Sequence, residues 1–230
     1  MNMTLRAIAA ARVRSLAVVL GLVVSILVPT LGASVAAATT VPAPGAASAA
    51  APGAFSGNWR VTTGSYTGYR VFTDVLFVGR QTIAGRTSAV TGSAQIRLVS
   101  GRERLTAARF TADLRKATTG NAAYDSQAAS VFETSRYPNG VFVLVTPVVL
   151  PSATTLARGS TVSLVGNLTL HGVTRRVTIA ARVIGSSRRV TVTGAVPIRL
   201  TDYRIPLIAA GGLARTDDRA TVDFRVVFVR

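Results

Sequence analysis

Few side chains in this sequence could carry out covalent chemistry. Among its 230 residues there is no cysteine and a single histidine, His171. The absence of cysteine excludes disulfides, thiolate metal sites and a cysteine nucleophile, and one histidine is too few for a histidine-rich metal cage. His171 could serve Asp202 and a serine as a catalytic triad, but nothing in their spacing brings the three together. We therefore predict no catalysis, no metal and no cofactor, and expect His171 to end a strand with its ring hydrogen-bonded to the backbone.

The chain carries a large positive charge. Lysine and arginine number 26 against 9 acidic residues, which gives a formal net charge of +17. This balance favours an anionic partner such as an acidic polymer or a membrane surface, although a preference for arginine over lysine is also typical of a GC-rich genome. Nucleic acid is not expected, because stacking aromatic residues do not accompany the basic ones. Arg182, Arg188 and Arg189 would gather charge at one hairpin end, either as solvated charge or as an anion site.

The N-terminal segment has the layout of an export signal. The first 15 residues are basic without an acid, an apolar run follows from Leu16 to Val28, and small residues come next. This order is typical of a cleaved signal peptide over residues 1–38. Residues 16–38 are also long enough to be retained as a transmembrane anchor. Both interpretations place the remaining chain outside the cytoplasm, secreted or in the cell envelope.

The rest of the chain divides into a linker and one domain. Residues 39–57 consist mainly of alanine, proline, glycine, serine and threonine, without apolar periodicity. Such a composition cannot bury a face and is typical of a tether. Residues 58–230 have the length of a single domain.

Alternation of apolar and polar residues dominates this domain. In residues 161–171, for example, apolar residues and glycine occupy the even positions and mostly polar residues the odd ones. A period of two is typical of half-buried strands. One segment, 119–135, breaks the pattern and is predicted to be a helix. About seven to nine strands with one inserted helix predict an all-β fold, an antiparallel up-and-down barrel, with a two-sheet sandwich as the alternative.

The alternation also suggests how one hairpin is paired. A two-residue loop at Gly185-Ser186 would place Val177 opposite Gly194 on the inner face. On the outer face it would set Arg182 directly opposite Arg189, an unfavourable pair of like charges.

Small residues are frequent on the inner face, which suggests a lumen that is partly empty. Pairing around the His171 turn would set Gly166 opposite Ile179, where the missing side chain would leave room in the lumen. Leucine at position 166 would then be tolerated and would exclude a ligand. The alternative is a barrel filled by the helix or by large neighbours. The residues expected to line the lumen are Phe110, Phe142, Val162, Leu164, Gly166, Leu168, Val177, Ile179, Val190, Val192, Gly194 and Phe224.

The segment Gly166–Arg175, with the sequence GNLTLHGVTR, resembles a characteristic motif of the YceI-like family. The resemblance extends over residues 58–230. Weaker similarities, in the same order as in the family, occur at Gly57–Trp59 with Gly68–Val71 (the family's first hairpin), Gly85–Thr87, Val90–Gly92, Tyr137-Pro138, Val141-Phe142, Thr201–Pro206 and Val222–Phe224.

The resemblance implies a lipocalin-like barrel whose apolar lumen binds isoprenoid chains or other long lipids, in proteins that are often exported. The family's helix often carries an Arg-Asp pair, whereas this chain has Tyr124-Asp125 at the matching positions. Asp125, His171 and Tyr203 are candidates for contact with the polar end of a ligand.

The leading hypothesis is therefore an exported protein that holds a polyisoprenoid or similar apolar chain without catalysis. The alternative is an envelope scaffold with a filled barrel that binds anionic lipids or polymers through its basic surface. The sequence carries no expectation about oligomeric state.

Overall fold

The computed structural model describes residues 53–230, and the predicted signal peptide or anchor and most of the linker lie outside them. The strands are β1 (Gly57–Val61), β2 (Tyr66–Val75), β3 (Gly79–Thr87), β4 (Val90–Val99), β5 (Arg102–Asp113), β6 (Asn139–Leu144), β7 (Val148–Val149), β8 (Ser160–Leu170), β9 (Val173–Gly185), β10 (Arg189–Arg199), β11 (Ala209–Ala210) and β12 (Ala214–Val229). The helices are α1 (Ala122–Val131) and α2 (Ala153–Arg158), with short 3₁₀ helices η1 (Leu114–Lys116) and η2 (Thr201–Tyr203).

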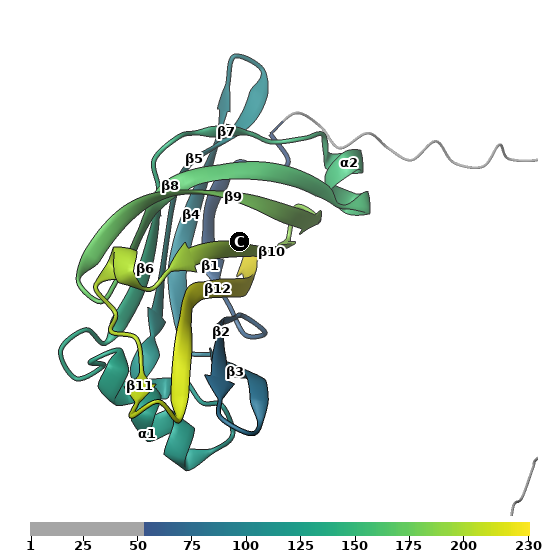
Figure 1. Cartoon of the computed structure of the whole chain (residues 1–230). Coiled ribbons are helices and arrows are strands. Elements are labelled where there is room, and N and C mark those ends of the chain that lie inside the picture. Colours follow the sequence, from purple (N-terminus) through teal and green to yellow (C-terminus); the bar gives the residue numbers. More distant parts are fainter. Residues whose placement is uncertain (1–52) are drawn as a thin grey trace, which may run out of the picture. The chain divides into compact units, whose positions relative to one another are not determined.

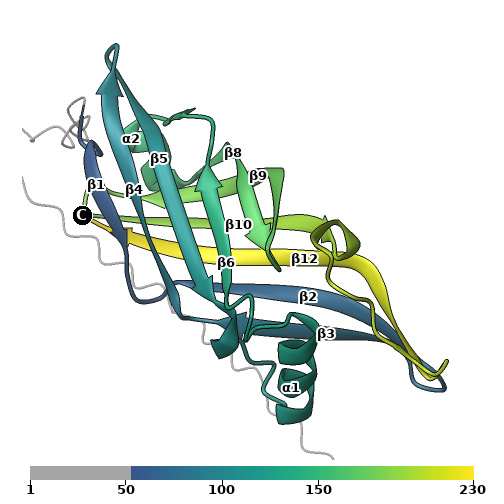
Figure 2. The same ribbon diagram turned by 90° about the vertical axis from the view of Figure 1, so that its left-hand side faces the viewer.

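Eight antiparallel strands close a barrel, as the sequence predicted (Figure 1). The ring runs β1-β4-β5-β6-β8-β9-β10-β12, and β1 completes it by pairing with both β4 and β12. The β2–β3 hairpin pairs with the long strand β12 from Ala214 to Arg225, and its tip extends away from the ring (Figure 2). β1 and β2 do not pair with each other, so the first hairpin suggested by the resemblance is wrong for this chain.

The barrel has two ends that differ in what covers them. At one end of the barrel, which we call end A, strands β4, β9 and β12 finish and strands β5, β8 and β10 begin. The opposite end is called end B. The segment between β5 and β6, residues 114–138, contains η1 and α1 and lies at end B (Figures 1 and 2). We call it the cover segment.

The predicted alternation is confirmed along the barrel strands. In β8, Val162, Leu164 and Leu168 are buried, whereas Thr161 and Ser163 are exposed. The core also includes Phe55, which is 1% exposed and stacks on Trp59, so packing begins within the stretch expected to be linker.

The predicted register of the β9–β10 hairpin is wrong by four residues. Gly194 lies opposite Ala181, and the turn residues are Ser187-Arg188, closed by a 2.8 Å hydrogen bond from Ser186 N to Arg189 O. Arg182 faces Thr193, so the expected pair of opposed arginines does not exist. The inner and outer faces were nevertheless predicted correctly, because a shift by an even number of residues leaves each side chain on its face.

The β8–β9 hairpin is likewise shifted, by two residues. Gly166 lies opposite Val177 and not Ile179, and the turn is formed by His171-Gly172. Both turn residues have positive φ, +49° and +72°, as a type I′ hairpin turn requires. Histidine tolerates this conformation better than most side chains do.

The inserted helix α1 is confirmed but is shorter than the predicted 119–135. Asn121 caps it by accepting hydrogen bonds from Ala123 N and Tyr124 N, and Glu133, with φ +43°, lies beyond its end. The short helix α2, which was not predicted, is capped in the same way by Ser152.

Candidate functional site: an apolar cavity at end B

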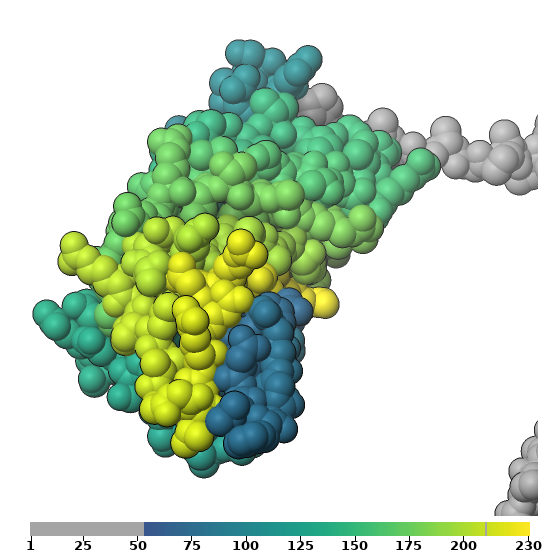
Figure 3. Space-filling view, viewed as in Figure 1, coloured from purple at the N-terminus to yellow at the C-terminus, as the bar shows by residue number. Residues whose placement is uncertain are grey.

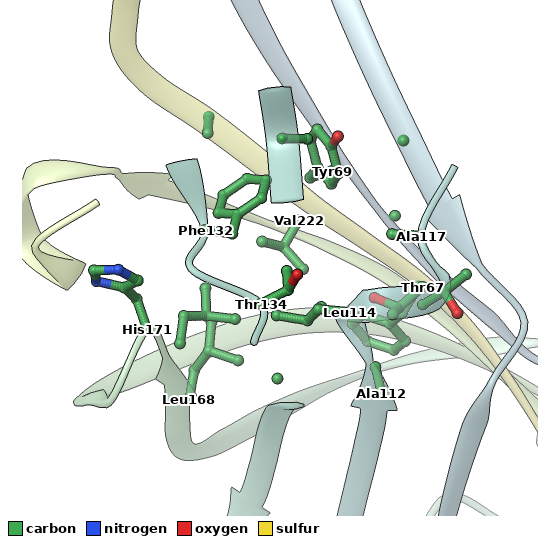
Figure 4. Close-up of a pocket in the computed structure, with 18 of the residues that line it drawn as sticks. Thr67, Tyr69, Ala112, Leu114, Ala117, Phe132, Thr134, Leu168, His171 and Val222 are labelled. Carbon is green, nitrogen blue, oxygen red and sulfur yellow. The ribbon is translucent and has the colours of Figure 1, made fainter. Parts of the chain in front are cut away.

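A cavity of about 510 Å³ lies between the barrel interior and the cover segment. Its size is within the usual range for small-molecule sites, about 300–1,000 Å³. Figure 4 shows Ala112 and Leu168 of the barrel on one side, with Tyr69 and Phe132 opposite them. The wall is mainly aliphatic and aromatic, so the cavity is suited to an apolar guest.

The cover segment is held to the barrel by a small number of polar contacts. The Asp113 carboxylate caps η1 by accepting a hydrogen bond from Arg115 N. The same carboxylate forms an ion pair of 2.9 Å with the Arg115 guanidinium. Thr118 and Arg86 of β3 exchange two backbone hydrogen bonds, each 2.9 Å. Phe132 packs edge-on against Tyr69, with ring centroids 5.1 Å apart.

Asp125, at the start of α1, fastens the loop that precedes the helix. Its carboxylate accepts three hydrogen bonds of 2.6 Å, from Thr118 Oγ1, Thr119 Oγ1 and Thr119 N. The side-chain hydrogen bond from Thr118, followed by those from Thr119, lowers the pKa of Asp125 below its ordinary value. Asp125 lines the cavity as the sequence suggested, but both of its oxygens are already engaged within the protein.

We expect Asp125→Asn to loosen the cover segment, because the amide cannot accept all three hydrogen bonds. A carboxyl whose pKa is lowered by folding stabilises the folded state above its unfolded pKa, about 3.9 for aspartate, and this contribution is lost as pH falls through the folded pKa. The urea midpoint of the variant should therefore lie below that of the wild type at neutral pH, and the gap should close under acid conditions. A gap that stayed constant down to acid pH would show that Asp125 does not act through its charge.

Tyr69 is a cavity residue that sequence reasoning missed. Burial, followed by the nearby charge of Asp125, raises the pKa of Tyr69 to about 12. The phenol therefore stays neutral and can donate a hydrogen bond. Its ring lies over Gly85, where a Cβ atom would approach the ring to 2.5 Å. The only signal in the sequence was the presence of both residues among the weaker family similarities.

His171 lies in the cavity wall at the turn between β8 and β9. Its side chain is only 8% exposed, and its ring packs 4.6 Å from that of Tyr137. Nε2 is 3.5 Å from Glu133 Oε1, but among the described residues neither ring nitrogen has a hydrogen-bond partner. The expectation that the backbone satisfies this histidine is therefore wrong. A buried polar group without a partner is costly, so a ligand group that reached these nitrogens would relieve that cost. Both nitrogens are buried where they lie, so the ring must turn toward the cavity to make such a contact.

About half of the residues expected to line the lumen do line the cavity: Phe110, Phe142, Leu164, Leu168, Ile179 and Phe224. The remainder lie outside its lining: Val162, Gly166, Val177, Val190, Val192 and Gly194.

The two inner glycines are not beside empty space. A Cβ atom at Gly166 would collide with the Phe142 ring and come within 2.5 Å of Val143 O. One at Gly194 would meet the Phe224 ring at 2.7 Å. The interpretation of these glycines as unfilled room was wrong, because phenylalanine rings occupy the space that they leave.

The third candidate for a ligand's polar end, Tyr203, does not line the cavity. It is 2% exposed in η2, and its hydroxyl has no hydrogen-bond partner within residues 53–230. Burial is the main reason that its pKa is raised. Its neighbours Leu200 and Ile205 do reach the cavity.

Tyr124, which replaces the family's arginine, is 48% exposed and is absent from the lining of this cavity. In α1 it is therefore Asp125, Ser126, Ala128 and Ala129 that contribute to the wall.

Two other features of residues 53–230 bear on what the site can hold. No group of three or more acidic or histidine side chains lies close enough to bind a metal ion there. None of the helices in this part of the chain is long and apolar enough to cross a bilayer.

Comparison with known protein families identifies the domain. The profile of the YceI-like domain matches residues 62–228. The chain belongs to the YceI-like family. The family resemblance of the GNLTLHGVTR segment is thereby confirmed, and that segment forms the end of β8, the His171 turn and the start of β9. A comparison with curated protein sequences gave no match.

Several solved structures share the fold at low sequence identity. A polyisoprenoid binding domain from Saccharophagus degradans, implicated in plant cell wall breakdown, is 19% identical, with 74% of this chain and 97% of that one covered and a TM-score of 0.56. Burkholderia cenocepacia BcnA is 20% identical, with 71% and 95% covered and a TM-score of 0.52. The Campylobacter jejuni YceI protein is 14% identical, with 65% and 86% covered and a TM-score of 0.50.

Proposed function

We propose that this protein is an exported carrier or store for a long apolar chain, such as a polyisoprenoid, and that it works by burial without catalysis. The observation that carries the proposal is the apolar cavity of about 510 Å³ between the barrel and the cover segment. Each buried methylene contributes roughly 0.8 kcal/mol, so a few prenyl units already supply substantial affinity. Chain length and shape would be selected by the cavity wall, which needs no reactive group.

Two further observations support this proposal. One structural relative is described as a polyisoprenoid binding domain. The N-terminal layout of a basic segment, an apolar run and small residues favours export of this chain.

The ligand is expected to carry a small hydrogen-bonding head. Neutral Tyr69 can donate to it, and the unpartnered nitrogens of His171 can donate or accept. Asp125 and Tyr203 are less suitable, since the former is engaged within the cover segment and the latter does not line the cavity.

The test is mass spectrometry of an organic extract of the purified protein. We expect an isoprenoid or long-chain lipid in stoichiometric amount. An extract free of lipid, from protein that also fails to take up added isoprenoid, would contradict the proposal. Preparing the protein separately from the cytoplasmic and extracytoplasmic fractions tests export, which a purely cytoplasmic pool would exclude.

His171→Phe is expected to change which lipids are bound rather than whether lipid is bound. Phenylalanine keeps an aromatic ring against Tyr137 but removes both nitrogens, so lipids with a hydrogen-bonding head should lose several-fold in relative occupancy while plain hydrocarbon chains are retained. Competition between a polyprenol and a hydrocarbon of matched length measures this ratio. Tyr137→Phe, which removes a hydroxyl but leaves the His171 nitrogens, is the matched control. An unchanged ratio in His171→Phe would remove the histidine from the binding site.

A further inference from the structure

The β4–β5 hairpin at end A has a surface that the cavity does not explain. Its tip projects beyond the body of the barrel, at the opposite end from α1 (Figures 1 and 3). β7 pairs with β5 only at Arg104 and Leu105, so the residues nearer the tip have no further strand beside them. At the tip, Leu98 is 47% exposed and Val99 is 39% exposed.

Arginines lie beside Val99, whereas Leu98 lies opposite Glu103 on the other face of the hairpin. Arg102 lies opposite Val99, and Arg97 lies opposite Arg104 in the strand register. Because side chains alternate across a strand, Arg97, Val99, Arg102 and Arg104 share one face of the hairpin.

Three like charges on one face repel each other unless an anion is present. No salt bridge to these three arginines occurs within residues 53–230, and Arg104 Nε is buried there without a hydrogen-bond partner. The neighbouring acid, Glu103, accepts a hydrogen bond from Phe55 N instead. The hairpin therefore combines an exposed apolar tip with positive charge that the protein does not neutralise.

The rest of end A has the same sign of charge. Of the nine acidic side chains, all within residues 53–230, only Glu103 lies at this end, and the C-terminal carboxylate is the other negative group there. The additional basic residues at end A are Arg158, Arg182, Arg188, Arg189 and Arg230.

We propose that the β4–β5 hairpin docks the protein on an anionic phospholipid bilayer. Arginine guanidinium groups pair with lipid phosphates, and a basic surface is attracted to anionic lipid. A soluble polyanion would explain the arginines but not the exposed Leu98 and Val99, which gain from entering the apolar edge of a bilayer and gain nothing from a polyanion in water. Residues 53–56 pack at the base of this hairpin through Phe55 and Glu103, so the chain enters the barrel at the docking end.

The absence of cysteine allows a direct test in the full chain. Val99→Cys carries an environment-sensitive fluorophore at the proposed docking tip. Phe77→Cys carries it at the tip of the β2–β3 hairpin, where Phe77 is 97% exposed at the other end of the molecule. With vesicles of mixed phosphatidylcholine and phosphatidylglycerol, the label at position 99 should shift to shorter wavelength and become protected from an aqueous quencher. The label at position 77 should do neither.

Charge variants show whether the arginines are responsible. Arg97→Gln combined with Arg102→Gln should lose most of the shift at position 99, whereas Arg215→Gln with Arg219→Gln, an equal change in net charge at other exposed sites, should keep it.

No shift at position 99, or an equal shift at position 77, would overturn the proposal. An equal shift with pure phosphatidylcholine would contradict the role of charge, and an equal shift with heparin would replace the bilayer by a soluble polyanion. None of these results depends on what the cavity holds.

Discussion

Ala112→Phe is expected to remove most of the lipid that co-purifies with the protein while leaving its fold and stability close to those of the wild type. Ala112 is 7% exposed, lies on the inner face of β5 and contributes to the cavity wall (Figure 4). A larger ring at this position extends into existing empty space, so the usual penalty for overpacking, about 1–3 kcal/mol, should be largely absent. Lipid content by mass spectrometry and the free energy of unfolding from urea titration measure the two effects.

The matched control is Ala108→Phe, four residues earlier on the same strand and face. Ala108 is 6% exposed but does not line the cavity. The added ring must therefore displace packed neighbours, and we expect destabilisation of about 1–3 kcal/mol with less effect on lipid content in the folded fraction. If Ala112→Phe kept full lipid occupancy, the ligand would not occupy this cavity.

Alanine at Gly166 should destabilise the barrel strongly, by about 3 kcal/mol or more, at the upper limit of overpacking effects. The new Cβ atom would meet Val143 O at 2.5 Å, and this oxygen is fixed in the β6–β8 pairing. The Phe142 ring occupies the same space. The sequence-based expectation that even leucine is tolerated here is accordingly replaced by the opposite prediction.

Gly194 can be compared with Gly166, because at Gly194 only side chains, and no backbone atom, obstruct an added Cβ atom. Alanine there meets the Phe224 ring and, at 3.2 Å, Ile179 Cγ2, so a smaller loss of about 1–3 kcal/mol is expected. Phe224→Leu should rescue Gly194→Ala, whereas Phe142→Leu should not rescue Gly166→Ala because the backbone oxygen remains. Equal rescue at both positions, measured by urea denaturation, would show that the side chains alone set the cost.

The sequence was sufficient to predict the barrel and the inner and outer faces of β4, β8, β9, β10 and β12, but not the register of the hairpins. The alternation of apolar and polar residues distinguishes the inner from the outer face of the barrel. It stays the same when Gly194 is paired with Ala181 instead of Val177. The true register depends on turn geometry, such as the two positive φ values at His171 and Gly172, and on close strand contact at Gly185, where a Cβ would collide with Arg189 O. Neither the turn geometry nor the close strand contact can be predicted from the alternation of apolar and polar residues.

The location of the cavity could be predicted only in part, for a similar physical reason. Inward-facing positions are known from the pattern, but which of them face empty space depends on where Phe142 and Phe224 place their rings. Leu114 and Phe132 belong to the cover segment, which has no strand alternation, so nothing in the pattern assigned them to the wall. His171 and Asp125 were found because polar residues at the ends of elements stand out against an apolar lumen.

The composition of the chain gives the cavity one more useful property. Lys116, in η1 of the cover segment, is the only lysine in the sequence, and it lies in the cavity lining. Amine-directed reagents therefore have a single side-chain target in the whole protein, and that target is where a guest molecule would be held. A lipid analogue with an activated ester at its polar end could acylate this amine and release its alcohol, so that a reversible guest becomes a covalent marker of occupancy at one defined position.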